Sequence, residues 1–299
     1  MRWRIFHKSQ MGLLDVTNSL LSAKPQTGEG ESGKAIGGAG TGILPAQALR
    51  ALIKSGEVAA DAGIEDDQVQ PASLDLRLGS VAYRLRASFL PGLGAGVTGK
   101  MSDLVMHKID LGAGAVLEVG CVYLVPLQER LTLTSRIAGR ANPKSSTGRL
   151  DVFTRLICDG ATEFDTVPAG YSGPLYAEIS PRTFSVLVRT GSKLNQLRLR
   201  RGTAAFPDTE LQRLHLRETL VSSEGDADIQ EGIACSVDLG GEPGSLIGYC
   251  AKRHAAVVDM DAEAAYDAHE FWDPVTIGAS RRLILDPNEF YILVSKEAI

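Results

Sequence analysis

The sequence predicts a mainly β protein, because short apolar segments with a period of two recur between glycine and proline turns. Glycine occurs 32 times and aromatic residues make up only 6% of the chain, which suits many short strands better than a bundle of helices. Short strands at close spacing are typical of a sandwich or barrel. The segments with this pattern are 69–85, 109–111, 115–117, 122–127, 131–133, 184–188 and 194–199.

Two segments instead repeat at the spacing of a helix. In residues 46–54, leucine and isoleucine recur every three to four positions, and Gly56 follows as the expected end of the helix. Residues 208–221 carry leucines on one side and predict a second helix that connects two units. A short helix at 13–21 also fits the pattern.

The chain length favours two domains, since 299 residues exceed one typical domain. The glycine-rich stretch 27–42 has no hydrophobic pattern, which indicates a flexible extension before the first ordered residue, Ile43. We therefore expect four parts: the extension at 1–41, a first β domain at 42–207, a linker helix at 208–226 and a second β domain at 227–299.

An internal repeat supports the division into two β domains. The segment A-S-L-D-L at 72–76 returns as C-S-V-D-L at 235–239, which is 163 positions later. The segment at 116–129, which contains V-L-E and V-Y-L-V, returns at 284–297 with an offset of 168. Two ordered matches with nearly equal offsets predict a duplication. The second copy ends before its counterpart of residues 144–178, so we expect a truncated second domain.

Composition limits the classes of partner. The net charge of −5 gives no global basic field, so we expect no nucleic-acid partner, and an anionic ligand has to be bound by a local cluster. Two such clusters are Lys144 with Arg149, and the arginines within 198–201. No apolar run approaches the roughly 18 residues that span a bilayer. No signal-peptide region follows the N-terminal cations, so we expect a cytoplasmic protein without a membrane partner.

The four cysteines are scattered and form no C-x-x-C pair, which argues against a disulfide framework. Residues 28–34 fit the phosphate-binding pattern G-x-x-x-x-G-K, but Ala35 stands where a Ser or Thr would hold Mg²⁺. No strand precedes this stretch, and its two glutamates would repel phosphate. A flexible linker is the favoured interpretation.

The strongest chemical signal lies between Lys144 and Glu178. Residues 144–149 read K-S-S-T-G-R, so two cations frame two hydroxyls, and this combination suits a cluster of anionic oxygens. A tight turn at 168–173 leads into an expected strand at 174–179, where Glu178 stands among apolar neighbours. The pattern predicts a site that binds a polyanion and carries out acid–base chemistry beside it.

Three ordered motifs resemble those of the dCTP deaminases. They are Q-P-A-S-L-D-L-R-L-G at 70–79, K-S-S-x-x-R at 144–149, and G-Y-S-G at 170–173 with Glu178 five residues later. These enzymes share the β-clip superfamily with the dUTPases, and the chain resembles their long bacterial form from residue 42 onward. The resemblance implies tandem dUTPase-like β-clip domains, each a distorted β-barrel or sandwich, with a few short helices.

The resemblance also implies hydrolysis of dCTP to dUTP and ammonia without zinc. The sequence agrees with the zinc-free chemistry, because it lacks the H-x-E and P-C-x-x-C motifs of the zinc deaminases. By the resemblance, Glu178 is the general base and acid, Ser145 holds the attacking water, and Arg149 lies near the phosphates and the carboxylate. The triphosphate would carry Mg²⁺.

Further contacts follow from the same resemblance. Lys144 and Ser146 match phosphate ligands. Asp165 matches a sugar contact less well, because the chain has P-A-G where the family commonly has D-P-G before the hairpin aromatic, and Asp165 lies three residues further upstream. Tyr171 matches that aromatic residue, which is expected to pack at the hairpin beside the substrate. By the resemblance, the site forms between neighbouring subunits or domains, so we expect a homo-oligomer with a trimer-like assembly of β-clip domains.

Other interpretations stay open at this stage. Ser145 and Ser146 also suit a turn cap, Arg149 suits a surface cation paired with Asp151, and Glu178 suits the solvated face of an edge strand. Among functions, a dUTPase would attack the α-phosphate instead of the base, and a bifunctional deaminase and dUTPase would carry out both steps. A non-catalytic nucleotide-binding β-clip protein is the third alternative.

Overall fold

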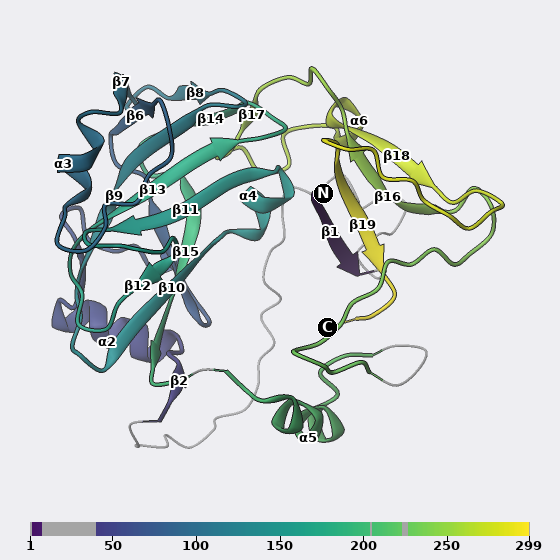
Figure 1. The fold of residues 1–299 in the computed structure, drawn as a ribbon, viewed down its shortest axis with the longest axis horizontal. Helices are drawn as coiled ribbons and strands as arrows, with labels where there is room; N and C mark the ends of the chain where they lie inside the picture. Colours follow the sequence, from purple (N-terminus) through teal and green to yellow (C-terminus); the bar gives the residue numbers. More distant parts are fainter. Residues whose placement is uncertain (1, 8–39, 204, 223–226, 299) are drawn as a thin grey trace. The chain divides into compact units, whose positions relative to one another are not determined.

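The computed structural model describes residues 2–7, 40–203, 205–222 and 227–298 (Figure 1). The chain forms two compact units, and neither is continuous in sequence. The larger unit comprises 24–204 with 257–262, and the smaller unit comprises 1–23, 205–256 and 263–299. The stretch 28–34 and the possible helix at 13–21 lie outside the described residues.

The larger unit is built from two six-stranded sheets and one of three strands. In the first six-stranded sheet, five strands follow in the order β12 (Thr166–Val167), β10 (Ile137–Pro143), β15 (Lys193–Arg201), β5 (Ser73–Arg77) and β4 (Val69–Gln70). The sixth strand, β2 (Gly42–Ile43), pairs with β15. In the second six-stranded sheet, the order is β11 (Val152–Cys158), β13 (Ser172–Pro181), β9 (Val122–Thr132), β6 (Val81–Leu85) and β7 (Val105–Asp110). The sixth strand, β3 (Val58–Ala60), pairs with β9. The third has the order β17 (Val258–Asp259), β14 (Val186–Val188), β8 (Ala115–Leu117).

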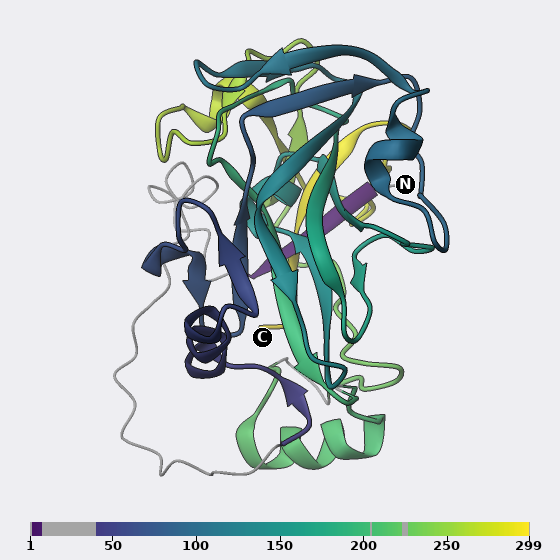
Figure 2. The ribbon, with the colours of Figure 1, turned by 90° about the vertical axis from the view of Figure 1, so that its left-hand side faces the viewer.

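Short helical segments accompany these sheets. Helix α2 (Ala46–Ser55), the dark purple helix of Figure 2, contacts β3, β4 and β5 and buries Leu49 and Leu52. Gly56 ends the helix with a φ of 80°, a left-handed conformation that glycine adopts without steric cost. This confirms the predicted helix and its end. The other segments are η2 (Asp66–Gln68), α3 (Val97–Met101) and α4 (Ser145–Arg149).

The core of the larger unit consists of inward-facing aliphatic side chains from these sheets. Leu76, Leu124 and Leu197 are fully buried, and they come from β5, β9 and β15. Burying such a side chain contributes about 1.5–3 kcal/mol relative to leaving it exposed. The predicted mainly β fold with few short helices is confirmed.

Strand boundaries differ from the sequence prediction in two places. The segments predicted at 122–127 and 131–133 form one strand, β9, of 11 residues. Strands β10 and β11 had no counterpart in the prediction. Burial alternates along β10, IAGRANP, but its buried face includes Gly139 and Ala141, which give a weak hydrophobic signal. The end of β11, VFTRLIC, is buried on both faces, so its sequence does not keep a period of two.

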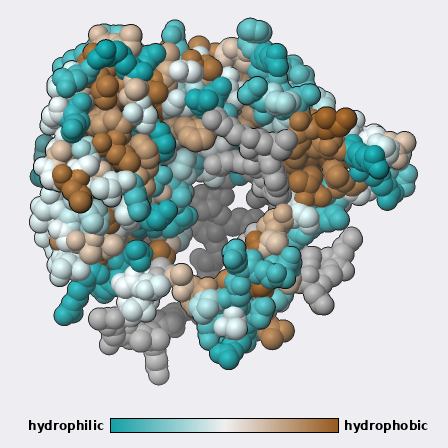
Figure 3. All heavy atoms as spheres, viewed as in Figure 1, coloured by the Kyte–Doolittle hydropathy of each residue, from teal (hydrophilic) through white to brown (hydrophobic). Residues whose placement is uncertain are grey.

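The smaller unit contains a four-stranded sheet in the order β1 (Arg2–His7), β19 (Phe290–Ser295), β16 (Leu246–Ala251), β18 (Trp272–Thr276). Trp272 and Phe290 pack with ring centroids 6.0 Å apart. Figure 3 shows apolar side chains gathered over β16 and β18. The unit also contains α6 (Ala268–Phe271) and α5 (Asp208–Glu218), which ends three residues before the predicted 221 and buries none of its side chains.

The flexible extension predicted at 1–41 is wrong for Arg2–His7, because these residues form β1. The strand pairs in parallel with β19 over six residues. A sheet edge presents unpaired N–H and C=O groups that can pair with any extended segment, even one far away in sequence. The hydrophobic pattern did not reveal this pairing.

The two units repeat the same ladder of strands. In the larger unit Tyr83 of β6 pairs with Leu124 of β9 and Lys108 of β7. In the smaller unit Tyr249 of β16 pairs with Ile292 of β19 and Pro274 of β18. A side-chain bond also recurs, because the Tyr123 hydroxyl accepts from Glu118 N at 3.0 Å and the Tyr291 hydroxyl accepts from Asp286 N at 3.2 Å. The sequence repeat therefore corresponds to a structural one.

Candidate active site

The predicted anion-binding residues lie where β10 ends and β11 begins. Lys144 precedes α4, and its backbone N donates to Leu194 O of β15 at 3.0 Å. Ser145 is exposed and Ser146 half-buried, so their hydroxyls are accessible. Arg149 is 9% exposed at the end of α4, which contradicts the alternative of a surface cation. The helical turn therefore exposes Ser145, whereas Thr147 and Arg149 are buried.

Lys144 is held by a carboxylate that sequence reasoning missed. Its Nζ forms an ion pair with Asp75 Oδ2 of β5. Asp75 is 3% exposed, and this burial raises the pKa of its carboxyl group, while the Lys144 ammonium acts in the opposite direction. Asp75 lies in the motif at 70–79 and in the S-x-D-L repeat, but neither pattern indicated that it pairs with Lys144. A phosphate that binds Lys144 therefore meets an ammonium group already positioned by Asp75.

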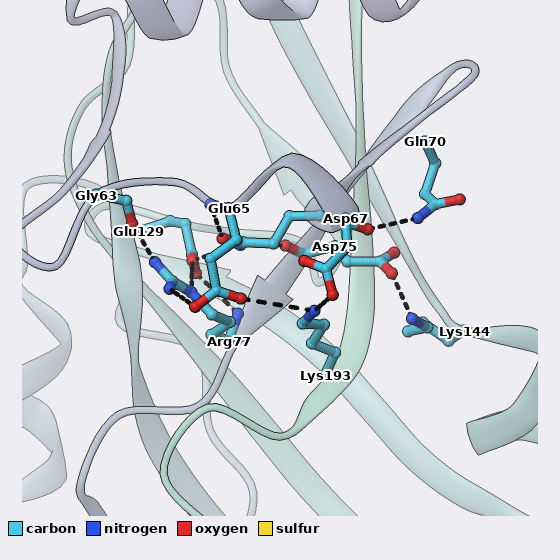
Figure 4. A network of polar contacts seen from close by, with 10 residues as sticks. Gly63, Glu65, Asp67, Gln70, Asp75, Arg77, Glu129, Lys144 and Lys193 are labelled. Carbon is cyan, nitrogen blue, oxygen red and sulfur yellow. Dashed lines mark hydrogen bonds and ion pairs between the residues drawn. The ribbon is translucent and has the colours of Figure 1, made fainter. Parts of the chain in front are cut away.

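A network of polar contacts supports this part of the site (Figure 4). Glu129, 1% exposed on β9, accepts from Arg77 N at 2.8 Å, from Arg77 Nε at 2.9 Å and from Gln68 Nε2 at 2.9 Å. Lys193 pairs with Asp67 at 2.6 Å. A buried ion pair is tolerated when further hydrogen bonds satisfy its atoms, as they do here. The network fixes β5, the strand that carries Asp75.

Glu178 lies on β13, between β11 and β9 in the second sheet. It is 2% exposed, so the alternative of a solvated edge-strand residue is wrong. Arg155 of β11 stands directly opposite and donates to Glu178 Oε1 through Nε, at 3.1 Å, and through Nη2. The other oxygen, Oε2, is buried without a hydrogen-bond partner among the described residues. One carboxylate oxygen, Oε1, thus accepts hydrogen bonds, and the other, Oε2, accepts none from the described residues.

Asp165 belongs to the same electrostatic neighbourhood. Burial raises the pKa of its carboxyl group, and nearby Glu178 acts in the same direction, whereas the Leu156 amide, Arg155 and Arg140 lower it. Its Oδ1 accepts from Leu156 N at 2.8 Å, and its φ of 63° lies in the left-handed region. Asp165 therefore closes the loop after β11. Its predicted role as a sugar contact stays a prediction.

Tyr171 packs at the start of the β13 hairpin, as expected for the hairpin aromatic. The residue is 8% exposed, and its hydroxyl donates to Pro174 O at 2.6 Å and accepts from Asp159 N at 3.2 Å. Burial raises the pKa of the phenol. Both polar capacities of the hydroxyl are used within the chain. Substrate contact by Tyr171 stays a prediction.

Arg155 was missed because its role depends on strand register. In the sequence it is one arginine in an unpredicted strand, 23 residues from Glu178, and only the antiparallel pairing of β11 with β13 brings the two together. Its guanidinium also stacks on Phe164 at 3.8 Å and donates to Ser88 Oγ at 3.0 Å. No local pattern indicates these contacts.

Comparisons with known proteins identify the family. The family model of the 2'-deoxycytidine 5'-triphosphate deaminase N-terminal domain matches residues 40–203. The family model of the C-terminal domain of these enzymes matches residues 207–299. The chain belongs to the dCTP deaminase family. A crystal structure of 2'-deoxycytidine 5'-triphosphate deaminase from Agrobacterium tumefaciens is 55% identical, with a TM-score of 0.83 over 87% of this chain and 75% of that chain.

More distant dCTP deaminases match about half of the chain. The dCTP deaminase of Haloarcula marismortui is 29% identical over 160 residues, which is 52% of this chain and 77% of the relative. The dUMP-forming dCTP deaminase of Mycobacterium tuberculosis is 28% identical over 163 residues, 54% of this chain and 82% of the relative. Among the described residues, no helix is both long and apolar enough to cross a membrane.

Proposed function

We propose that this chain hydrolyses dCTP to dUTP and ammonia, with Glu178 as the group that moves protons. The observation that carries the proposal is the buried Glu178 with its unoccupied Oε2, in a chain of the dCTP deaminase family. A carboxylate with an acceptor oxygen free can act as a general base, and the ion pair with Arg155 holds the other oxygen.

The proposed reaction moves one proton twice. Glu178 takes a proton from water held by Ser145, and the water oxygen bonds to C4 of cytosine. Glu178 then gives the proton to the exocyclic amine, the C4–N bond breaks, and ammonia leaves. Proton transfer by a positioned side chain contributes about 10²–10⁴-fold to such a step. The triphosphate would be held by Lys144, Ser146 and Arg149. The sugar would lie against Asp165 and Tyr171.

Mg²⁺ fits this site as a partner of the substrate. In the described part of the chain, no group of three or more His, Cys, Asp or Glu side chains is arranged to hold a metal ion. A hard cation that keeps its waters is commonly bound through phosphate oxygens, so Mg²⁺ would enter with the triphosphate. Turnover is expected to fall when EDTA removes Mg²⁺ and to recover when Mg²⁺ is restored. Unchanged turnover in EDTA would contradict this role.

Glu178→Gln is the decisive variant. It is expected to lower ammonia release from dCTP by about 10²–10⁴-fold, because the amide cannot accept the proton. Binding of dCTP, measured by calorimetry, should stay within a few-fold of the unmodified protein. Glu118→Gln, at an exposed carboxylate of the same unit, is the matched control and should keep full activity. Loss of dCTP binding in place of turnover would contradict the assigned role.

The dUMP-forming relatives favour one second candidate, a bifunctional deaminase. Chromatography of the products separates the possibilities. Ammonia with dUTP supports deamination alone, and ammonia with dUMP and pyrophosphate supports both steps. Release of dUMP from dUTP without ammonia from dCTP would indicate a dUTPase, and binding without turnover a non-catalytic protein. We also propose a homo-oligomer, for which light scattering coupled to size exclusion gives the number of chains.

A further inference from the structure

Arg155 is bonded directly to the proposed acid–base residue, Glu178. Strand pairing places Arg155 and Glu178 directly opposite each other on β11 and β13. Both Nε and Nη2 of Arg155 donate to the same oxygen, Oε1. The usual fork arrangement would engage one carboxylate oxygen with each nitrogen. Here both donors converge on one oxygen, and the buried Oε2 has no hydrogen-bond partner within the described part of the chain.

The guanidinium is itself fixed from other sides. It lies 3.8 Å from the ring centroid of Phe164, and Nη2 also donates to Ser88 Oγ at 3.0 Å. A cation over an aromatic face is attracted by the ring, so Phe164 holds the guanidinium as well as orienting it. The Arg155 side chain is 34% exposed, whereas that of Glu178 is 2% exposed. Arg155 therefore reaches the surface, whereas Glu178 is buried.

We infer that Arg155 is a positioning residue that makes the two oxygens of Glu178 unequal and directs proton transfer to Oε2. This inference rests on the proposed role of Glu178. Binding Oε1 fixes the rotation of the carboxylate and occupies that oxygen, so Oε2 is the oxygen left to take a proton. Arg155 acts through Glu178 and needs no contact with the nucleotide.

The charged groups around Glu178 come from two neighbouring strands and a loop. Arg155 faces it from β11, Asp165 lies in the loop after β11, and Arg140 of β10 acts on Asp165. The strand on the other side, β9, places the apolar Leu124 opposite Glu178. Without Arg155 the two carboxylates would lose their shared cation.

The test compares Arg155→Gln and Arg155→Lys with the unmodified protein in dCTP turnover. Arg155→Gln is expected to lower kcat at least about 10-fold and to change KM less than about 3-fold. Arg155→Lys restores the charge without the fork and should recover part of the lost kcat.

Arg130→Gln is the matched control, because Arg130 forms an exposed ion pair with Asp61 in the same unit. It should leave kcat and KM unchanged. An unchanged kcat in Arg155→Gln, with or without a rise in KM, would overturn the inference. A structural role alone would lower the melting temperature, and Arg155→Lys would then recover no kcat.

Glu178→Gln separates a failure of the role given to Arg155 from a failure of the role given to Glu178. If Glu178→Gln is inactive and Arg155→Gln behaves like the unmodified protein, only the role of Arg155 is wrong. If Glu178→Gln still releases ammonia at the normal rate, the catalytic assignment itself is wrong, and the inference about Arg155 is lost with it.

Discussion

At the scale of single residues, burial and ion pairing act on the carboxylates in opposite directions. Burial raises the pKa of Asp75, although Lys144 is bonded to it. Asp259 shows the reverse, because the hydrogen bonds from Arg189 lower the pKa of its carboxyl group. Desolvation disfavours the charged form and a nearby cation favours it, and the larger effect decides. The two residues should therefore contribute to stability with opposite pH dependence.

Stability measurements on Asp75→Asn and Asp259→Asn test this directly. Asp75 has a raised pKa in the folded protein, so its contribution is fully present below the usual pKa and is lost as pH rises through the folded value. The unmodified protein should thus gain stability relative to Asp75→Asn as pH falls from about 7 to about 4. The contribution of Asp259 is present above about pH 4 and lost below it. Urea unfolding at several pH values gives both differences, and equal slopes would contradict the prediction.

At the scale of elements, close backbone contacts fix how the strands begin. Gly79 lies just before β6, and its N donates to Pro126 O of β9 at 2.8 Å. A Cβ at this position would come within 2.6 Å of the same oxygen. Because Pro126 lies inside the ladder of β9 with β13, its backbone cannot move away easily. The motif at 70–79 therefore ends in glycine for a steric reason.

Gly79→Ala is expected to destabilise the protein by about 1–3 kcal/mol, the usual cost of overpacking a well-packed site. Gly99→Ala is the matched control, since Gly99 lies in α3 with nothing within 4 Å of the added Cβ. That change should stabilise by up to about 1 kcal/mol, because alanine favours a helix. Thermal unfolding measures both. If Gly79→Ala leaves thermal stability unchanged, the backbone of β9 can move to accommodate the added Cβ, and the prediction is wrong.

At the scale of the whole molecule, the compact units do not follow the order of the chain. Residues 257–262 come from the part that matches the C-terminal family domain, yet they belong to the larger unit. Strand β17 pairs in parallel with β14. Arg189 holds this segment through both oxygens of Asp259, at 2.7 and 2.8 Å, and Ser192 Oγ donates to Asp261 at 2.6 Å.

Arg189→Gln should loosen this segment without unfolding the unit. Hydrogen exchange is expected to accelerate at the amides of Val258 and Met260, which donate to Ser185 O and Leu187 O. Amides of β13 should exchange at the normal rate. Arg253→Gln removes a comparable pair with Glu289 in the smaller unit and serves as the control. Unchanged exchange at Val258 and Met260 would show that backbone pairing alone holds β17.

The sequence by itself determined the mainly β class, α2 with its glycine end, the repeat and the family, because these depend on local period, turn chemistry and ordered motifs. It also indicated Glu178 and the segment 144–149. Only the tertiary structure decided that Arg155 faces Glu178, that Asp75 holds Lys144, that Arg2–His7 add a strand to β19 and that residues 257–262 join the larger unit. These contacts join residues that are far apart in sequence, so strand register decides them and local sequence does not.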